Sequence, residues 1–140
     1  MKRIGCFLEN HPELRGVSAT SKEVAKAEEE LKIMLDDDYK ESIARFGGFY
    51  AGVAVHAFSN ASDMGRETVI ELTNRCRNSF RESDYFDEIN GSLVFSDDGA
   101  GNPITINSSG QVVIYYHDSG YKEVLSESFE SFIEKSFVEW

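Results

Sequence analysis

Hydrophobic and polar positions alternate most regularly in the stretch Leu93–Leu125. The segments Pro103–Asn107 and Gln111–Tyr116 repeat their side-chain pattern at every second position, which is the period of a β-strand. Turn-forming residues separate the strands, at Asp97–Asn102 and again at Ser108–Gly110. The pattern predicts an antiparallel meander in which the run 111–116 is a central strand, because both of its faces are apolar.

Apolar residues at helical spacing mark segments before and after this meander. A capping-box pattern at Thr20 and Glu23 predicts the start of the first helix, and Asp36–Asp38 is typical of the first turn of the second. Gly47 and Gly48 are expected to end that second helix. Phenylalanines near the C-terminus predict a last helix that packs on the sheet. The predicted helices span residues 22–35, 37–46, 66–80 and 128–137.

Three further segments complete the predicted fold. Alternation over Phe49–Phe58 predicts a strand that pairs with the meander. The segment Met1–Ser18 is interpreted as a short edge strand or a packed N-terminal arm, and Glu82–Asn90 as a short helix or an irregular acidic loop. Together the elements predict one α+β domain over residues 1–140, with a central, mainly antiparallel sheet flanked by helices and the C-terminal helix packed on it.

The chain is strongly acidic, and its charge is unevenly distributed. The 140 residues contain 25 acidic and 14 basic side chains, for a net charge of −11. Residues 1–81 hold 13 acidic and 12 basic side chains, whereas residues 82–140 hold 12 acidic and only 2 basic ones. Such a surface disfavours direct binding of nucleic acid and favours a basic partner, although an acidic surface also serves solubility alone.

No run approaches the length of a membrane span, and the first residues do not resemble a signal peptide. A cytoplasmic protein that does not bind membranes is therefore expected. Cys6 and Cys76 lie far apart in a chain without an export signal, so both are expected to be buried thiols without a disulfide between them. Cys76 belongs to the apolar stripe of the third predicted helix and is expected to be buried.

Few residues form a pattern typical of an enzyme. The best catalytic or metal-binding candidates are Asp97 and Asp98 together with His117 and Asp118, at two predicted turns. These residue types also form turns by bonding to local backbone, which is the simpler interpretation. The spacing does not fit a calcium loop, and no zinc, nucleophile or phosphate-binding motif is present. We therefore expect no catalytic residues, no metal site and no cofactor.

Several short motifs resemble those of the SMI1/KNR4 (SUKH) family. They occur in the family's order over Val17–Val138. Asp37 departs from the family pattern, because a proline is usual at its position. The motifs are Leu35-x-x-x-Tyr39-Lys40-x-x-Ile43, Phe46-Gly47-Gly48, Phe95-x-Asp97-Asp98-Gly99-x-Gly101-Asn102-Pro103-Ile104, Gly110-x-Val112, His117-Asp118 and Ser128-Phe129-Glu130-x-Phe132-Ile133.

The resemblance implies a SUKH-like fold and a non-catalytic protein that binds another protein. The family includes immunity proteins that neutralise polymorphic toxins and regulatory scaffolds of the yeast Smi1/Knr4 type. A short acidic chain fits the first class better, since a toxin domain that cuts nucleic acid presents a basic cleft that an acidic plug can block. The alternative is a regulatory scaffold or a ligand-sensing interaction module whose acidic face is incidental. A monomer is expected.

The contact surface is expected in the acid-rich C-terminal half. Acidic side chains there would steer a basic partner, and tyrosines beside them would supply the buried anchors of the interface. The predicted partner-binding residues are Asp84, Tyr85, Asp87, Glu88, Asp97, Asp98, Asp118 and Tyr121.

Overall fold

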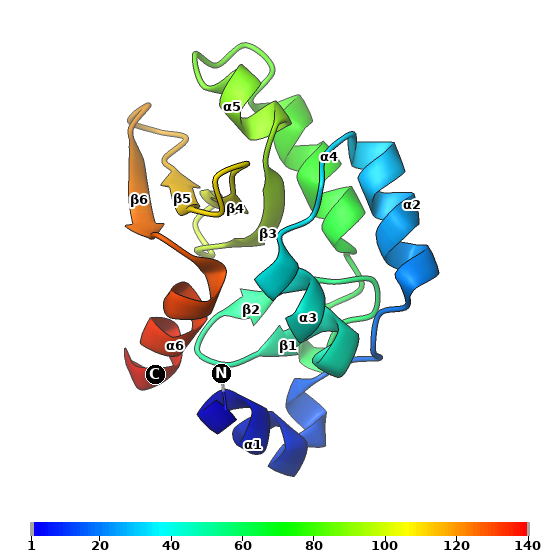
Figure 1. The fold of residues 1–140 in the computed structure, drawn as a ribbon. Coiled ribbons are helices and arrows are strands. Elements are labelled where there is room, and N and C mark those ends of the chain that lie inside the picture. The colour runs from blue at the N-terminus through cyan, green and yellow to red at the C-terminus, as the bar shows by residue number, and fades with distance from the viewer. Residues whose placement is uncertain (1, 140) are drawn as a thin grey trace.

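The computed structural model describes residues 2–139, with side chains as far as Phe137. Over these residues the chain forms one α+β domain, and the predicted fold class is confirmed (Figure 1). The α-helices are α1 (Lys2–Asn10), α2 (Ser21–Leu31), α3 (Asp37–Phe46), α4 (Val69–Ser79), α5 (Phe86–Asn90) and α6 (Phe129–Glu139). The strands are β1 (Phe49–Tyr50), β2 (Ala54–Val55), β3 (Leu93–Asp97), β4 (Pro103–Ile106), β5 (Val112–Tyr115) and β6 (Lys122–Ser126), and the 3₁₀ helices are η1 (Pro12–Leu14) and η2 (Ser62–Met64).

Strands β3 to β6 form the central sheet in the order β3-β4-β5-β6, and each neighbouring pair is antiparallel. The turn between β4 and β5 follows its sequence signal, because Gly110 has a φ of 84°. The side chain of Asn107 accepts hydrogen bonds from the backbone N–H groups of Ser109 and Gln111 in the same turn. The predicted meander is confirmed, with β5 between β4 and β6.

Both faces of the central sheet are covered. On one face, Phe95 packs against Tyr39 of α3 and Phe129 of α6. On the other face, Val94 packs against α4, including the buried Cys76. A second apolar group on this face consists of Phe80, Ile89, Val113 and Tyr115. Strands β3, β4 and β5 therefore lie between two layers, whereas the first three residues of the edge strand β6 are exposed.

The C-terminal helix is anchored on the sheet by aromatic rings. The buried ring of Phe129 makes edge-on contacts with the rings of Phe95 and Tyr39, at centroid distances of 5.3 and 5.6 Å. The ring of Phe132 lies 6.0 Å from that of Phe95. Figure 1 places α6 directly after β6, at the end of the molecule that also holds α1. The predicted packing of the last helix is confirmed.

Local hydrogen bonds set the helix boundaries. Both bonds of the predicted capping box join Thr20 and Glu23 at the start of α2. The side chain of Asp36 accepts from the backbone N–H of Tyr39 at 3.1 Å and caps α3, as expected from the acidic run. Helix α2 ends at Leu31 instead of residue 35, because Lys32 adopts a left-handed conformation with φ 57°.

The segment Phe49–Phe58 differs from the prediction, because it does not form one strand. It folds into β1 and β2, which pair with each other through a turn that contains Gly52 at φ 81°. A backbone hydrogen bond of 2.9 Å from His56 to Phe95 joins it to the meander, but the two sheets share no ladder. Small residues at Ala51 and Gly52 permit this reversal, which alternation alone does not reveal.

The N-terminal stretch forms helix α1 and not the edge strand considered from the sequence. Ile4 and Leu8 are one helical turn apart, and both are buried in the main core. The carboxylate of Glu9 lies 3.3 Å from the guanidinium of Arg45 in α3. Ile4, Phe7 and Leu8 lie on one face of this helix and pack against the core. The segment is thus a packed N-terminal arm, which was the second interpretation of the sequence.

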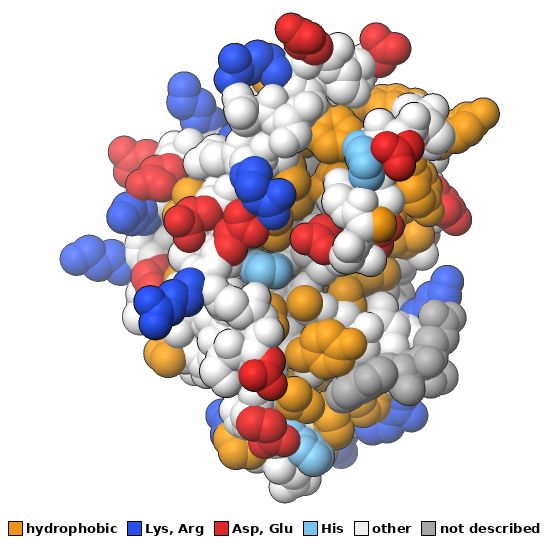
Figure 2. Space-filling view, turned by 180° about the vertical axis from the view of Figure 1, so that it is seen from behind, with side chains coloured by type: hydrophobic (Ala, Val, Ile, Leu, Met, Phe, Trp, Pro, Cys, Tyr) orange, Lys and Arg blue, Asp and Glu red, His pale blue; other side chains and the backbone are white. Residues whose placement is uncertain are grey.

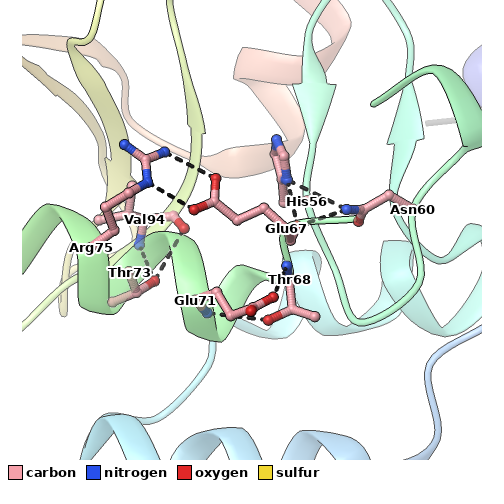
Figure 3. A network of polar contacts seen from close by, with 8 residues as sticks. All are labelled: His56, Asn60, Glu67, Thr68, Glu71, Thr73, Arg75 and Val94. Carbon is pink, nitrogen blue, oxygen red and sulfur yellow. Dashed lines mark hydrogen bonds and ion pairs between the residues drawn. The ribbon is translucent and has the colours of Figure 1, made fainter. Parts of the chain in front are cut away.

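A polar network fixes α4 and the loop before it against the sheet (Figure 3). The side-chain amide of Asn60 donates to the backbone oxygen of Glu67 at 2.8 Å. The carboxylate of Glu67 accepts two hydrogen bonds from Arg75, of 2.8 and 2.9 Å. The hydroxyl of Thr73 accepts from the backbone N–H of Val94 at 3.0 Å and donates to its oxygen at 3.1 Å. The hydroxyl of Thr73 thereby forms the pair of backbone hydrogen bonds that a neighbouring strand would otherwise make with β3.

Arg77 of α4 is a partly buried cation whose Nε and Nη2 atoms are shielded and have no hydrogen-bond partner among the described residues. Burial also lowers its pKa. Because a shielded N–H group without an acceptor costs about 1–3 kcal/mol, Arg77→Met is expected to raise the free energy of unfolding by about 1 kcal/mol. Urea unfolding measures the change. Arg81→Met is the control, since Arg81 is exposed and bonds to Asn78; destabilisation by Arg77→Met would contradict the interpretation.

Both cysteines are free thiols, and Cys76 is buried as expected. The expectation that Cys6 is also buried is wrong, because Cys6 lies on the exposed face of α1, away from the buried Ile4 and Leu8. Burial raises the pKa of Cys76 to about 11. At pH 8 its thiolate fraction is therefore on the order of one in a thousand. We expect a disulfide reagent at pH 8 to modify one thiol per native chain quickly, and the second only after urea is added. Cys6→Ser should abolish the fast phase, and a fast phase that persists in this variant would show that Cys76 is accessible.

Candidate functional site

Three loops meet at one end of the central sheet, namely residues 80–85 before α5, the β3–β4 turn at 98–102 and the β5–β6 turn at 116–121. They surround a space of about 500 Å³, which we call the aromatic hollow. Figure 2 shows, in its upper right part, a histidine and an acidic side chain next to exposed hydrophobic side chains. The hollow is lined by Ser79, Phe80, Ser83, Tyr85, Gly101, Tyr116, His117 and Gly120.

Asn102 joins two of these loops. Its side-chain nitrogen donates to the carboxylate of Asp98 at 2.8 Å, which fixes the orientation of the amide. Its oxygen then accepts from the backbone N–H of His117 at 2.9 Å and from ring atom Nδ1 at 2.7 Å. Because an amide oxygen only accepts, Nδ1 carries a proton. The other ring nitrogen lies 3.0 Å from a carboxylate oxygen of Asp118, so contacts within the chain orient both sides of the imidazole.

Tyr85 fixes the loop before α5 against the sheet. Its ring lies 5.6 Å from the ring of Tyr115. The ammonium group of Lys122 lies 5.6 Å from the centre of the Tyr85 ring and 2.7 Å from a carboxylate oxygen of Glu88. The hydroxyl of Tyr115 donates to the same oxygen at 3.2 Å. Burial and the nearby Glu88 carboxylate raise the pKa of Tyr115, so this phenol stays protonated and keeps its role as donor.

Three of the eight predicted partner-binding residues are engaged within the chain. Asp97 accepts from a backbone N–H of its own turn at 2.8 Å. Burial alone would raise the pKa of Asp98, but hydrogen bonds from Asn102 and from the backbone N–H of Ala100 lower it. The interpretation of both aspartates as turn formers is confirmed. Glu88 is neutralised by its contact with a lysine, so it offers less free charge than the sequence indicated.

The other five predicted residues are at least partly exposed, although Asp118 also contacts His117 and Tyr85 also contacts Lys122. Tyr85 lines the hollow, and Asp84 adjoins it in the chain and is exposed. The side chain of Asp118 is 89% exposed, and Tyr121 is 71% exposed beside the lining residue Gly120. Asp87 is exposed on α5. Residues 82–90 thus combine both structures expected from the sequence, a turn-rich loop followed by a short helix. The part that these residues play in binding stays a prediction.

Sequence reasoning missed Phe80 and Tyr116 as walls of the hollow. Their apolar spacing assigned them to the buried faces of a helix and a strand. Each lies at the end of its element, Phe80 as the cap of α4 and Tyr116 one residue after β5. The expected burial is confirmed for Phe80, which is 9% exposed, whereas Tyr116 is only half-buried beside the following turn. An aromatic residue that directly precedes a loop rich in serine, glycine or aspartate is the signal that could have identified them.

The structure describes no group of three histidine, cysteine, aspartate or glutamate side chains, within residues 2–137, arranged to hold a metal ion. His56 is held by the polar network, because its Nδ1 lies 2.9 Å from the backbone oxygen of Glu67 (Figure 3). Among the helices described here, none has both the length and the apolar character needed to cross a bilayer.

Two further shallow hollows, of about 300 and 430 Å³, lie at the opposite end of the sheet. Met34 is 79% exposed at their edge. Their charged neighbours have both signs, since Lys32 and Lys40 accompany Asp36 and Asp37. This end therefore matches a strongly basic partner less well than the aromatic hollow does.

Comparison with known proteins identifies the family. A search among curated proteins gave no match. A family model described as the SMI1 / KNR4 family (SUKH-1) matches residues 18–135, a region that contains α2 to β6, most of α6 and all residues of the aromatic hollow. Proteins of this family are associated with protein–protein interaction. The chain therefore belongs to the SMI1/KNR4 (SUKH-1) family.

Proposed function

We propose that this protein is an immunity-type protein, which neutralises a toxin by binding it directly and catalyses no reaction of its own. Membership of the SUKH family supports the proposal, because its domains are often immunity proteins. The structural observation that carries it is the aromatic hollow with exposed carboxylates beside it at one end of the sheet. These residues come from the half of the chain with 12 acidic and 2 basic side chains.

The arrangement fits a partner with a basic surface, such as the active-site cleft of a toxin that cleaves nucleic acid. Exposed acidic side chains increase the rate of association with such a surface, while buried aromatic side chains slow dissociation. We assign the first role to the exposed Asp84, Asp87 and Asp118, and the second to Tyr85 and Tyr121. A bound acidic domain would then block the toxin's substrate by occupying its site.

The runner-up is a regulatory scaffold or a ligand-sensing interaction module, which would use the same end of the sheet for a different protein. The two functions differ in the partner. An immunity protein is encoded beside a toxin gene, and it rescues cells that express this toxin. A scaffold has no such neighbour and confers no protection.

The test uses the toxin encoded beside this gene and measures its association with the protein at low and high salt. We expect the association rate to fall by about tenfold or more as salt rises, because screening weakens steering by exposed charges. The triple variant Asp84→Asn, Asp87→Asn, Asp118→Asn should associate slowly at low salt and show little further dependence on salt.

A matched control changes the same charge elsewhere. Glu29, Asp37 and Asp63 are also exposed, and none of them lines the aromatic hollow, so their triple replacement by the corresponding amides removes the same charge elsewhere. This control variant should keep most of the association rate and most of the protection against the toxin. Equal losses in the two triple variants would place the interface elsewhere. The lack of any toxin gene, or of protection by the unaltered protein, would favour the scaffold.

A further inference from the structure

The aromatic hollow combines features that favour a cationic side chain. Its walls include the rings of Phe80, Tyr85, Tyr116 and His117. Carboxylates lie close to these rings, since Asp118 lies 3.0 Å from the imidazole. A hydrogen bond to Glu123, and the more distant charge of Asp98, raise the pKa of Tyr116. Rings that face a space beside negative charge attract cations through both the ring quadrupole and the carboxylates.

The chain already binds one of its own cations by this chemistry. The ammonium group of Lys122 lies 5.6 Å from the centre of the Tyr85 ring and 2.7 Å from Glu88. Tyr85 also forms part of the wall of the hollow, whose lining, in the part of the chain that is described, contains no lysine or arginine. The hollow thus has the same combination of aromatic rings and a nearby carboxylate that binds Lys122, but its lining contributes no cation of its own.

We infer that the aromatic hollow receives an arginine side chain of the protein partner. The inference rests on the proposed function, because it requires a partner with a basic protein surface. The guanidinium lies against the rings of Tyr85 and Tyr116, and its N–H groups reach acceptors at the rim, foremost the carboxylate of Asp118.

The lining favours arginine over lysine. A guanidinium is planar, weakly hydrated and carries five donors, so it stacks on rings while it donates in its own plane. The hollow offers acceptors at several points, because it is lined by Ser79, Ser83, Gly101 and Gly120, which supply hydroxyl and backbone oxygens. A lysine ammonium is a compact, strongly hydrated charge with three donors and no planar face, so it gains less from stacking on the rings.

The test titrates the peptide acetyl-Gly-Arg-Gly-amide into the ¹⁵N-labelled full chain at low salt and follows the backbone amide signals by NMR. We expect weak, saturable binding, with shifts confined to residues 79–85, 98–102 and 116–121. The matching lysine peptide should bind at least about threefold more weakly, since it gains less from stacking. The glutamine peptide, which has no charge, should produce no saturable shift.

Two variants locate the binding. Tyr85→Leu removes a ring but keeps an apolar side chain, and Asp118→Asn removes a charge from a residue whose side chain is 89% exposed. Each should weaken binding of the arginine peptide at least about threefold. Because the side chain of Asp118 is almost fully exposed, its replacement by asparagine is not expected to unfold the chain, so this variant supplies the test if Tyr85→Leu unfolds. The control Asp37→Asn changes a 97% exposed acid at the other end of the sheet and should have no effect.

Shifts centred elsewhere, saturable binding of the glutamine peptide, or unchanged affinity in the Asp118→Asn variant would overturn the inference. The proposed function fails in a different way. If the toxin binds at this end and the arginine peptide does not, the arginine inference is wrong while the immunity function stands. If the peptide binds in the hollow and no toxin is neutralised, the chemistry of the hollow stands and the immunity function is wrong.

Discussion

Replacement of Gly47 by alanine is expected to lower the free energy of unfolding by at least about 3 kcal/mol, enough to unfold many domains of this size. Gly47 ends α3 with φ 63° and ψ −148°, a conformation that costs a residue with a Cβ about 1–3 kcal/mol. The added Cβ would also lie 2.2 Å from the backbone oxygen of Val17. Val17 cannot easily yield, because its neighbours Gly16 and Ala19 donate backbone hydrogen bonds to the end of α3.

The control for this variant is Gly65→Ala. Gly65 has nearly the same conformation, with φ 83° and ψ −176°, but an added Cβ would meet nothing within 4 Å. Its replacement therefore measures the conformational cost alone, about 1–3 kcal/mol. Urea unfolding of both variants separates the two contributions. Equal losses of stability would show that the close approach to Val17 is not what requires glycine at position 47.

Most of the fold was predictable, because its local signals agree with its tertiary contacts. Three patterns have the predicted role in the structure. Thr20 and Glu23 cap α2, Gly110 forms the β4–β5 turn, and the aromatic side chains of α6 pack on the sheet. The segment Phe49–Phe58 was mispredicted because alternation is the same in one long strand and in two short strands. What distinguishes the two structures is the tight turn at Gly52, which has a positive φ. Whether the chain turns there depends on how the flanking residues pack in the core, which the sequence pattern does not show.

The site was predictable only in part. The uneven charge indicated the half of the chain that supplies most of the lining of the aromatic hollow, and the turn motifs indicated loops that do converge there. The sequence could not reveal which acids are already paired, because Lys122 meets Glu88 across 34 positions of sequence. Nor could it show that Asn102 fixes His117, since that contact joins two different turns. Partners of this kind depend on the register of the sheet, which patterns of single strands leave open.

Replacement of Phe129 by alanine is expected to cost about 3–5 kcal/mol, as for other large-to-small changes in a core. Phe129 is fully buried, and its ring is held edge-on between Phe95 of the sheet and Tyr39 of α3. Tyr39 in turn donates its hydroxyl to the backbone oxygen of His56 at 2.6 Å. The cavity would therefore open where α6, α3 and the sheet meet, and none of these elements can collapse into it without breaking other contacts.

Urea unfolding should show a lower midpoint with an unchanged slope, because the surface exposed on unfolding stays nearly the same. Phe132→Ala, at a residue that is 7% exposed, should fall near the lower end of the same range. Phe137→Ala is the control, because this half-buried ring packs on Phe7 of α1 at 5.1 Å, away from the sheet, and its removal should cost only about 1–2 kcal/mol. If Phe129→Ala cost no more than the control Phe137→Ala, or matched the unaltered protein, α6 would be a peripheral helix and not the cover of the sheet.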